Sequence, residues 1–396
     1  MTATSSPGEK TAGFGLFLGM AVACGIAVAN LYYNQPLLAL MAADLGTSHQ
    51  VIGLVPTATQ VGYALGLLLL VPLGDIIDRR KLILLQSGAL MAALAVMALA
   101  PYVAVVLAAS VAVGVASTIA QQIIPFAAAM ADERSRGQVV GIVMSGLLGG
   151  ILLARTVSGF VGEYFGWRAA YVLGVVLTGL LALAMARLLP RGQGGGAGPR
   201  PSYLALLASL GAVARRHPVL VKASLVQATQ FWSFSAFWST LALHLEGPAY
   251  GLGADIAGLF GILALVGVLA APVAGRLADR YGAGAVITVG LAAVGLGFLD
   301  FTLVPGIPGL IIGVVLFDFG VQLSMVAHQA RIFALEPAAR SRINTVFMTT
   351  LFTAGAISSA VATVTYAAGG WLALTLSSVA VTAVGLALHL LWRPQA

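Results

Sequence analysis

Charged side chains are scarce in this sequence. They make up 8% of its 396 residues, against 60% hydrophobic residues, whereas a soluble globular protein carries about 25% charged residues. The shortage excludes an ordinary soluble domain and predicts an all-α membrane protein, because helices satisfy their own backbone hydrogen bonds in lipid. At roughly 20 apolar residues per span, twelve transmembrane helices fill the chain with little left over.

Groups that usually mark enzymes and cofactor sites are also missing. Cys24 is the single cysteine, so an intrachain disulfide is excluded. The five histidines are scattered, and no cluster has catalytic or metal-ligand spacing. The sequence has no Walker-type phosphate loop. We therefore expect no enzymatic activity, metal, cofactor or direct use of ATP. A sensor with a soluble output domain is disfavoured as well, because the longest hydrophilic segment is one short linker.

Long apolar runs account for most of the chain. They predict a bundle of six helices in residues 1–190, a cytoplasmic linker at 191–218 and a second bundle of six helices in 219–396. Within the linker, residues 203–217 have the pattern of an amphipathic interfacial helix. The expected spans are 14–34, 51–72, 82–100, 103–125, 138–160, 169–188, 219–243, 255–275, 284–303, 309–330, 343–367 and 371–391.

The basic residues are distributed unevenly along these expected spans. If the loop at Asp75 lies inside the cell, every Lys and Arg except Arg155 and Arg168 falls on the cytoplasmic side. This matches the positive-inside rule and predicts both termini in the cytoplasm, with the chain in the inner membrane. The asymmetry also explains the pI of 9.8 without nucleic acid as a partner.

Two charged loops mark an internal repeat. Residues 71–81 pack charges between two apolar runs, and a partly similar segment, Gly275-Arg-Leu-Ala-Asp-Arg-Tyr-Gly282, follows 204 residues later. The same offset relates Gly166-Trp167 to Gly370-Trp371 and Arg136 to Arg340. Three anchors at one spacing predict a chain built twice, as many transporters are, with the substrate site between the halves.

The second loop resembles the signature of the major facilitator superfamily, Gly-x-Leu-Ala-Asp-Arg-x-Gly. The first loop is looser, with Val71 and Asp78 in place of the two glycines. The resemblance covers nearly the whole chain and is strongest to the branch of drug–proton antiporters and of sugar and nucleoside exporters. It implies two pseudo-symmetric bundles and a conformational latch formed by the charged residues of the two loops: Asp75, Arg79, Arg80, Asp279 and Arg280.

Polar residues in the first, second and fourth spans are candidates for a substrate cavity. Asn30, Tyr33 and Asn34 have i, i+3, i+4 spacing and share one helical face. Gln60 and Gln122 lie in two further apolar runs. Amides in a membrane are costly unless they face a partner or water. Helix capping and interhelical hydrogen bonds are the structural alternative, and Gln122 beside Pro125 fits the satisfaction of freed backbone groups.

The fifth span departs from the pattern of the resembled exporters. They often carry Gly-x-x-x-Gly-Pro-x-x-Gly-Gly, whereas this chain reads Gly150-Ile-Leu-Leu-Ala-Arg-Thr-Val-Ser-Gly159. Arg155 therefore replaces proline. A charge near the membrane centre costs at least about 2.5–3.5 kcal/mol on insertion scales. Arg155 is either an anchor at the outer interface or a cavity-facing cation that binds a polar or anionic substrate or pairs with a carboxylate.

The seventh and tenth spans supply the remaining candidates. Gln227, Phe231, Phe234 and Trp238 share one helical face, and aromatic walls with a few polar groups are typical of ligand sites. Asp318 falls near the midplane of its span, with Gln322 one turn away. Burial favours the neutral form of an isolated carboxyl group, so Asp318 is the predicted proton-coupling residue, with a paired or capped structural acid as the alternative.

The predicted function is proton-coupled efflux of a drug, sugar or metabolite by alternating access. Its partners are a small-molecule substrate, protons and the lipid bilayer, and the chain is expected to work as a monomer. The alternative is an importer or facilitator of an organic anion that uses Arg155.

Overall fold

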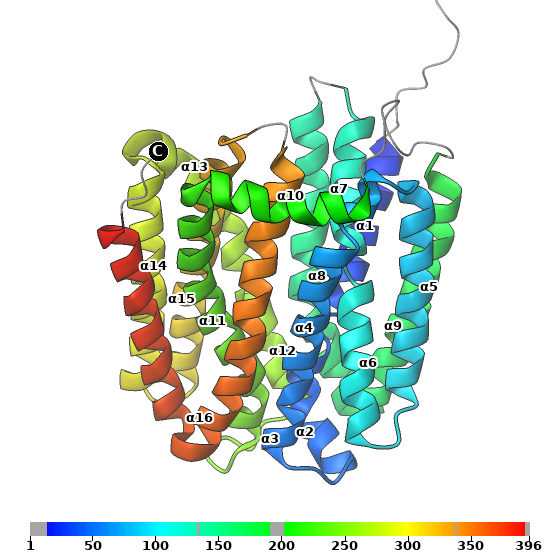
Figure 1. Cartoon of the computed structure of the whole chain (residues 1–396). Helices are drawn as coiled ribbons and strands as arrows, with labels where there is room; N and C mark the ends of the chain where they lie inside the picture. The colour runs from blue at the N-terminus through cyan, green and yellow to red at the C-terminus, as the bar shows by residue number, and fades with distance from the viewer. Residues whose placement is uncertain (1–13, 133–134, 191–201, 337–338, 393–396) are drawn as a thin grey trace, which may run out of the picture.

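The computed structural model describes residues 14–132, 135–190, 202–336 and 339–392, apart from the side chains at positions 136, 268, 269, 271, 272 and 279. Within these residues, every regular element is a helix. Figure 1 shows that most of them run side by side as long, roughly parallel rods, while α10 lies across one end. We call this end the α10 face.

The first half of the chain, residues 14–188, is called the N-terminal half below. Its helices run up and down between the α10 face and the opposite face. They are α1 (Phe14–Ala29), α2 (Asn34–Asp44), α3 (His49–Ile52), α4 (Leu54–Leu69), the 3₁₀ helix η1 (Pro72–Asp75), α5 (Arg79–Ala98), α6 (Val103–Ala116), α7 (Ile119–Met130), α8 (Arg136–Phe165) and α9 (Trp167–Leu188).

The second half, residues 218–391, is called the C-terminal half. Its helices are α11 (Pro218–Glu246), α12 (Ala254–Leu263), α13 (Leu265–Tyr281), α14 (Ala283–Leu303), α15 (Ile307–Phe333) and α16 (Arg340–Leu391). The last of these contains two helices joined at a kink, because Gly369 and Gly370 have non-helical backbone angles. Gly370 and its repeat partner Gly166 both have positive φ, a conformation that glycine adopts without steric cost.

Several helices are long and apolar enough to cross a membrane. In the described part of the chain there are nine, or ten if the bent pair α10–α11 forms one span. One of the nine is α16, which holds two helices, and the apolar helix at 254–267 is shorter than the others. The protein is therefore a helical, multi-pass membrane protein, and the full count of twelve stays a prediction.

The first span extends beyond its expected end at residue 34. A short break follows Ala29, and α2 then continues the same rod to Asp44. The predicted end was therefore wrong. Pro36 lies in the first turn of α2, where proline is accepted, so it does not end the span. The break changes the rotational phase, so residues after Ala29 face different neighbours from those that one continuous helix would give.

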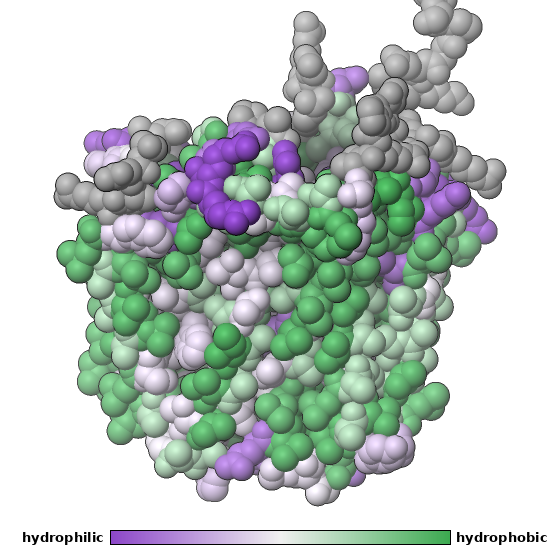
Figure 2. Space-filling view, viewed as in Figure 1, coloured by the Kyte–Doolittle hydropathy of each residue, from purple (hydrophilic) through white to green (hydrophobic). Residues whose placement is uncertain are grey.

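The outer surface of the molecule matches a lipid environment. On the side seen in Figure 2, the middle of the bundle is mainly hydrophobic, and hydrophilic residues gather mostly at the α10 face. Large apolar side chains such as Leu85, Leu153 and Val364 are more than 60% exposed. Exposing such a surface to water would be unfavourable. In a bilayer it is the surface expected to face the lipid tails.

The helix α10 runs across both halves at its face. Tyr203 at its start donates a hydrogen bond to the Leu69 carbonyl of the N-terminal half (2.8 Å). At its end, His217 and Arg216 contact the Glu336 carboxylate at 3.0 and 3.4 Å. The hydrogen bond with His217, aided by Arg216, lowers the pKa of Glu336. An amphipathic helix thus follows the expected pattern at 203–216, while residues 191–201 of the predicted linker lie outside the described part.

The halves make direct contacts toward the face opposite α10. Thr156 of α8 donates to the Gly258 carbonyl of α12 (3.0 Å), and Glu163 accepts from the Ala254 amide (2.9 Å). His49 and Glu246 approach to 3.7 Å across the same boundary. These contacts hold the two halves together at this end of the molecule.

Close helix packing relies on glycine. Gly150 of α8 lies so near Gly25 of α1 that an added Cβ would overlap the Gly25 backbone. In lipid, small residues allow this approach, and van der Waals contact replaces the hydrophobic effect as the main attraction between helices. The neighbouring Gly149 has open space around the same position.

We expect Gly150→Ala to destabilise the protein and Gly149→Ala to leave it unchanged or slightly more stable. Overpacking at Gly150 costs about 1–3 kcal/mol, whereas alanine favours the helix at Gly149. Thermal unfolding of both variants in detergent measures the difference. Equal melting temperatures would show that α1 and α8 do not pack through these glycines.

Candidate functional site at the centre of the bundle

The side chain of Arg155 lies between the two halves. It comes from α8 and is 1% exposed. Its Nε donates to Gln35 Oε1 at 2.6 Å, and Nη1 donates to the Ile151 carbonyl at 3.2 Å. The interface-anchor reading of Arg155 is therefore wrong, because the guanidinium faces the protein interior rather than the outer boundary of the membrane.

Aromatic rings surround this guanidinium. Its central carbon lies 4.1 Å from the ring centroid of Trp238, 4.6 Å from that of Tyr32 and 5.5 Å from that of Phe234. Tyr32 belongs to the N-terminal half, while Phe234 and Trp238 lie on α11 of the C-terminal half. Cation–π attraction strengthens when the cation is removed from water, so the cage helps to hold a charge that lipid would not.

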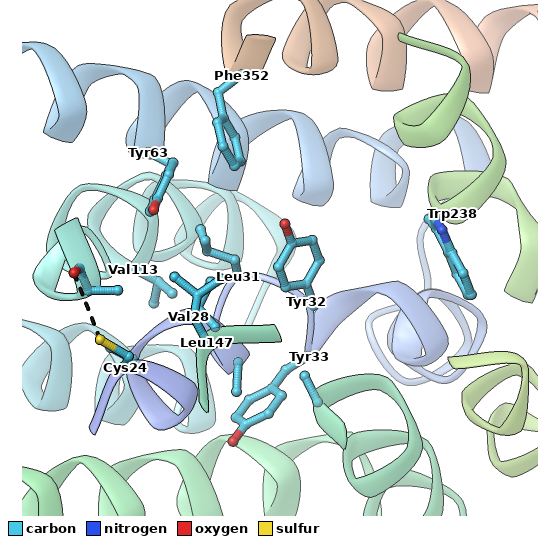
Figure 3. Close-up of a cluster of buried hydrophobic side chains, with 14 of the residues drawn as sticks. Cys24, Val28, Leu31, Tyr32, Tyr33, Tyr63, Val113, Leu147, Trp238 and Phe352 are labelled. Atoms are coloured by element: carbon cyan, nitrogen blue, oxygen red, sulfur yellow. Dashed lines mark hydrogen bonds between the residues drawn. The ribbon is translucent and has the colours of Figure 1, made fainter. Parts of the chain in front are cut away.

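A wall of rings continues from the cage. Phe231 lies 5.4 Å from Phe234 and 4.9 Å from Phe352, which in turn lies 4.3 Å from Tyr63. Figure 3 shows Tyr32 between the Tyr63–Phe352 pair and Trp238, whereas the adjacent Tyr33 points the opposite way. The wall thus joins α4, α11 and α16 across the boundary between the halves.

A small cavity lies beside these rings. It is lined by Leu31, Tyr32, Gln35, Pro56, Gln60, Phe231, Phe234, Ser235 and Phe352, and its volume is about 10 Å³. This is about the room needed for one water molecule, whereas small-molecule sites measure roughly 300–1,000 Å³. A substrate can therefore bind here only after the helices of the two halves move apart.

Gln60 links the halves next to the cavity. Its Nε2 donates to Ser359 Oγ at 2.8 Å, and its Oε1 accepts from Ser235 at 3.1 Å. Ser239 and Ser359 are also within 2.7 Å of each other. The two hydrogen bonds of Gln60 would break when the halves separate, whereas the Ser239–Ser359 contact lies within the C-terminal half. Separation thus leaves the Gln60 amide and the Ser235 hydroxyl free for a polar part of a substrate.

Asp318 lies on α15 and is 3% exposed. Arg155 acts on it electrostatically, and the Trp238 indole lies beside it. Among the described residues, no ion pair within 4 Å joins Asp318 to a base, and its Oδ2 has no hydrogen-bond partner. A direct ion pair is thus not present, whereas capping by the Trp238 indole remains the structural alternative for Asp318. Arg155, Tyr32, Gln35, Phe234, Trp238 and Asp318 are called the central site below.

Other polar candidates are placed away from this centre. The Asn30 amide donates to the Ile26 carbonyl of its own helix (2.8 Å), and both Asn30 and Tyr33 pack against Gly174 of α9. Asn34 donates to Thr59 at 3.0 Å within the N-terminal half. The prediction that these three line the cavity was wrong in this conformation, because the break after Ala29 turns Tyr32 and Gln35 inward instead.

Three predicted glutamines also face their own half. Gln122 donates to the Leu70 carbonyl at 2.9 Å. This contact agrees with the alternative that Gln122 provides a hydrogen-bond partner for a backbone group. Gln227 donates to the Val321 carbonyl at 3.3 Å. The side chain of Gln322 packs beside Gly267 of α13. These contacts serve helix packing and leave Gln60 as the predicted glutamine that borders the central cavity.

The predicted latch shows contacts within single halves. Arg79 reaches Asp75 at 3.4 Å, and Arg80 donates to the Ala186 carbonyl at 2.5 Å. Arg280 lies over the neighbouring Tyr281 ring. The Asp279 side chain lies outside the described part, so the role of the latch stays a prediction.

Sequence patterns missed some members of the site. Tyr32 and Gln35 stand at i, i+3 spacing, one position out of phase with the predicted face. This spacing is visible in the sequence. It identifies an inward-facing pair only when α2 is known to begin at Asn34. Gln121 and Asn344 join the halves nearer the α10 face at 3.4 Å. Gln121 stood out in the sequence only as one of a polar pair beside Pro125, and Asn344 carried no distinguishing pattern.

Comparisons with known proteins agree with this geometry. The model of the Major Facilitator Superfamily matches residues 16–327 and again 223–396. The chain belongs to the major facilitator superfamily. Members of this superfamily are transporters, so the protein is a membrane transporter and not an enzyme.

Two relatives extend along nearly the whole chain. It is 35% identical over 372 residues to the uncharacterized transporter YgaY of Escherichia coli O157:H7, covering 94% of each chain. It is 34% identical to the probable transporter SCO4007 of Streptomyces coelicolor, covering 93% of this chain and 85% of the relative. Neither name states a substrate.

Solved structures share the fold at low sequence identity. The nucleoside transporter NupG superposes with a TM-score of 0.77 at 14% identity, covering 94% of this chain and 98% of the other. The D-xylose–proton symporter gives 0.75 at 14% identity, covering 96% and 98%. A bacterial homologue of the lysosomal transporter Spinster, inward-facing and occupied, gives 0.78 at 15%, covering 98% and 100%.

A reducible cross-link between positions 49 and 246 should stop transport. In a Cys24→Ala background, we expect His49→Cys/Glu246→Cys protein treated with a short bis-methanethiosulfonate reagent to stay closed on the face opposite α10, because the ends of the native side chains meet across the halves and the reagent spans the gap that shorter cysteine side chains leave. Gel mobility reports the cross-link, and flux of any ligand that the purified protein binds reports transport. The two single-cysteine variants are the controls, and reduction should restore flux. Full transport by the cross-linked protein would contradict movement of the halves at this face.

Proposed function

We propose that this transporter couples the movement of a small organic molecule to protons, with Asp318 as the proton carrier. The observation that supports this most strongly is its position: Asp318 is the one buried acidic side chain among the described residues. It lies at the boundary between the halves, where alternating access changes the surroundings most. A carboxyl group that meets water from alternate sides is able to bind and release protons there.

The mechanism requires two states that bind their ligands differently. A ligand shifts an equilibrium only by the difference in its affinity for the two states. In the closed arrangement seen here, rings and serines fill the centre. In an open one, Arg155, Gln60 and Asp318 meet water, and a substrate is able to replace the contacts between the halves.

The first candidate is proton-driven export of a drug, sugar or metabolite. It follows from the resemblance of the loop motifs to exporters, and it requires proton and substrate to compete for the central site. In this proposal the α10 face is cytoplasmic, both termini lie inside, and the chain acts as a monomer in the inner membrane. The charged loops at 75–80 and 279–280 would stabilise one of the two orientations.

The second candidate is an importer or facilitator of an organic anion. The specific observation in its favour is Arg155, which faces the centre and not the lipid. Planar guanidinium groups bind carboxylates through paired donors. In this candidate the proton and the substrate bind to the site at the same time, whereas in the first candidate they compete for it.

Replacing Asp318 with asparagine should uncouple transport from protons. In proteoliposomes with an imposed pH gradient, we expect Asp318→Asn to equilibrate a bound ligand across the membrane without accumulating it, because asparagine cannot bind the transported proton. A pH-sensitive dye and ligand counts measure the two fluxes. Candidate ligands come from a thermal-shift screen of the purified protein.

The matched control is Asp300→Asn, which removes an acid from α14 outside the central site. It should keep gradient-driven accumulation close to that of the unchanged protein. Accumulation that survives in Asp318→Asn, together with ligand-dependent proton flux, would show that another group carries the proton.

A further inference from the structure

Three buried polar atoms at the central site have no hydrogen-bond partner among the described residues. They are Arg155 Nη2, Trp238 Nε1 and Asp318 Oδ2. They come from α8, α11 and α15, so both halves contribute. Buried polar groups in native proteins are nearly always paired. The Arg155 guanidinium lies over the Trp238 ring, and the indole is the hydrogen-bonding neighbour of the Asp318 carboxyl group without reaching ideal geometry. These incompletely paired atoms therefore indicate one region in which a ligand would supply the missing partners.

The donors outnumber the acceptors in this cluster. Arg155 and Trp238 offer only N–H groups, and Asp318 offers an O–H as soon as it is protonated. Three neighbouring side chains then offer donors in one region between the halves. The group that satisfies all of them is an anion with several acceptor oxygens, such as a carboxylate.

Charge balance leads to the same conclusion. Arg155 stays protonated in proteins, and an uncompensated charge in a dry interior is costly. With no ligand, ionised Asp318 balances Arg155. A bound monoanion would leave an excess negative charge, which uptake of one proton by Asp318 removes. A bound cation would instead leave an excess positive charge beside Arg155.

The groups facing Asp318 support this account. Arg155 is the charged side chain that acts on it among the described residues, and Trp238 is the polar neighbour. Gln322 lies one turn along α15, and its side chain is packed against α13. Among the residues that the structure describes, no second buried acid accompanies it that could accept the proton or balance a cation.

From these observations we propose that the substrate is an organic monoanion with a flat apolar body, and that one proton binds with it rather than in its place. The anionic group binds Arg155 Nη2 and Trp238 Nε1 and accepts a hydrogen bond from protonated Asp318. The apolar body lies along Phe231, Phe234 and Phe352. This inference rests on the proposed proton coupling at Asp318.

The sign of the coupling follows from the arrangement. Because anion and proton occupy the site together, they cross in the same direction and carry no net charge. A pH gradient drives such transport, whereas the membrane potential has no direct effect on it. The geometry therefore favours the anion carrier over an exporter in which proton and substrate compete.

A set of three ligands with one skeleton tests the proposal. The probes are 3-phenylpropionate, 3-phenylpropanol and 3-phenylpropylamine, which are anionic, neutral and cationic near neutral pH. Calorimetry with the full-length protein, in buffers of different ionisation enthalpy, gives both affinity and the number of protons exchanged. We expect the anion to bind most tightly and to take up about one proton, so its affinity falls about tenfold per pH unit where Asp318 is ionised without ligand.

Variants separate the contributions of the three side chains. Arg155→Gln should weaken anion binding at least about tenfold and change binding of the alcohol little. Trp238→Phe should weaken the anion selectively, whereas Trp232→Phe on the same helix is the matched control. Asp318→Asn should still bind the anion, because its amide donates, but with no proton uptake and no pH dependence.

The outcomes distinguish failure of this inference from failure of the proposed function. Tighter binding of the amine, proton release on anion binding, or no anion binding at millimolar concentration would overturn the monoanion proposal. Proton exchange that accompanies the amine or the alcohol and disappears in Asp318→Asn would keep Asp318 as the carrier while replacing the substrate class. No proton exchange with any bound probe would overturn both.

Discussion

A charged guanidinium in the dry centre of a lipid-embedded bundle constrains much of this structure. Water is not available to solvate Arg155, so the protein supplies an amide oxygen from Gln35, a backbone carbonyl, three aromatic faces and the opposite charge of Asp318. These groups come from both halves. The arrangement is thus sensitive to how the halves meet, which is the property that a transporter has to exploit.

Close approach of helices makes this arrangement possible. Gly25 and Gly150 bring α1 and α8 together in the N-terminal half, and Gly159 and Gly258 bring α8 and α12 together across the halves. Without side chains at these points, backbones touch and Arg155 reaches the aromatic wall on α11. Larger residues would separate the helices and leave polar groups in contact with lipid.

The central site is closed in this structure, with a cavity of about 10 Å³. Hydrogen bonds through Gln60, Ser235 and Ser359 and the ring contacts of Phe231 and Phe352 hold it shut. The hydrogen bonds of Gln60 and the ring contact between Tyr63 and Phe352 join one half to the other, whereas Phe231 and Phe352 both belong to the C-terminal half. Any substrate must therefore compete with contacts between the halves, so binding and the change of orientation share the same set of side chains.

Composition and the long apolar runs were sufficient to predict a multi-pass helical membrane protein, because lipid tolerates only internally bonded helices and few charges. The family fold was predicted from the resemblance of the loop motifs. Asp318 and Arg155 were recognisable as charges in apolar runs, and their roles stay predictions. The sequence also placed Phe231, Phe234 and Trp238 on one helical face, and the structure brings all three to the centre.

Tertiary structure decided which polar residues face the cavity. Each residue turns a helix by about 100°. Because the helix breaks for a few residues after Ala29, Tyr32 and Gln35 face the centre instead of Tyr33 and Asn34. The tertiary structure also determined that Arg155 faces inward. Gln122 and Gln227 donate hydrogen bonds to backbone carbonyls instead of facing the cavity. Periodicity defines a face but not its neighbour, and only the packing of the two halves determines whether that neighbour is lipid, another helix or the substrate path.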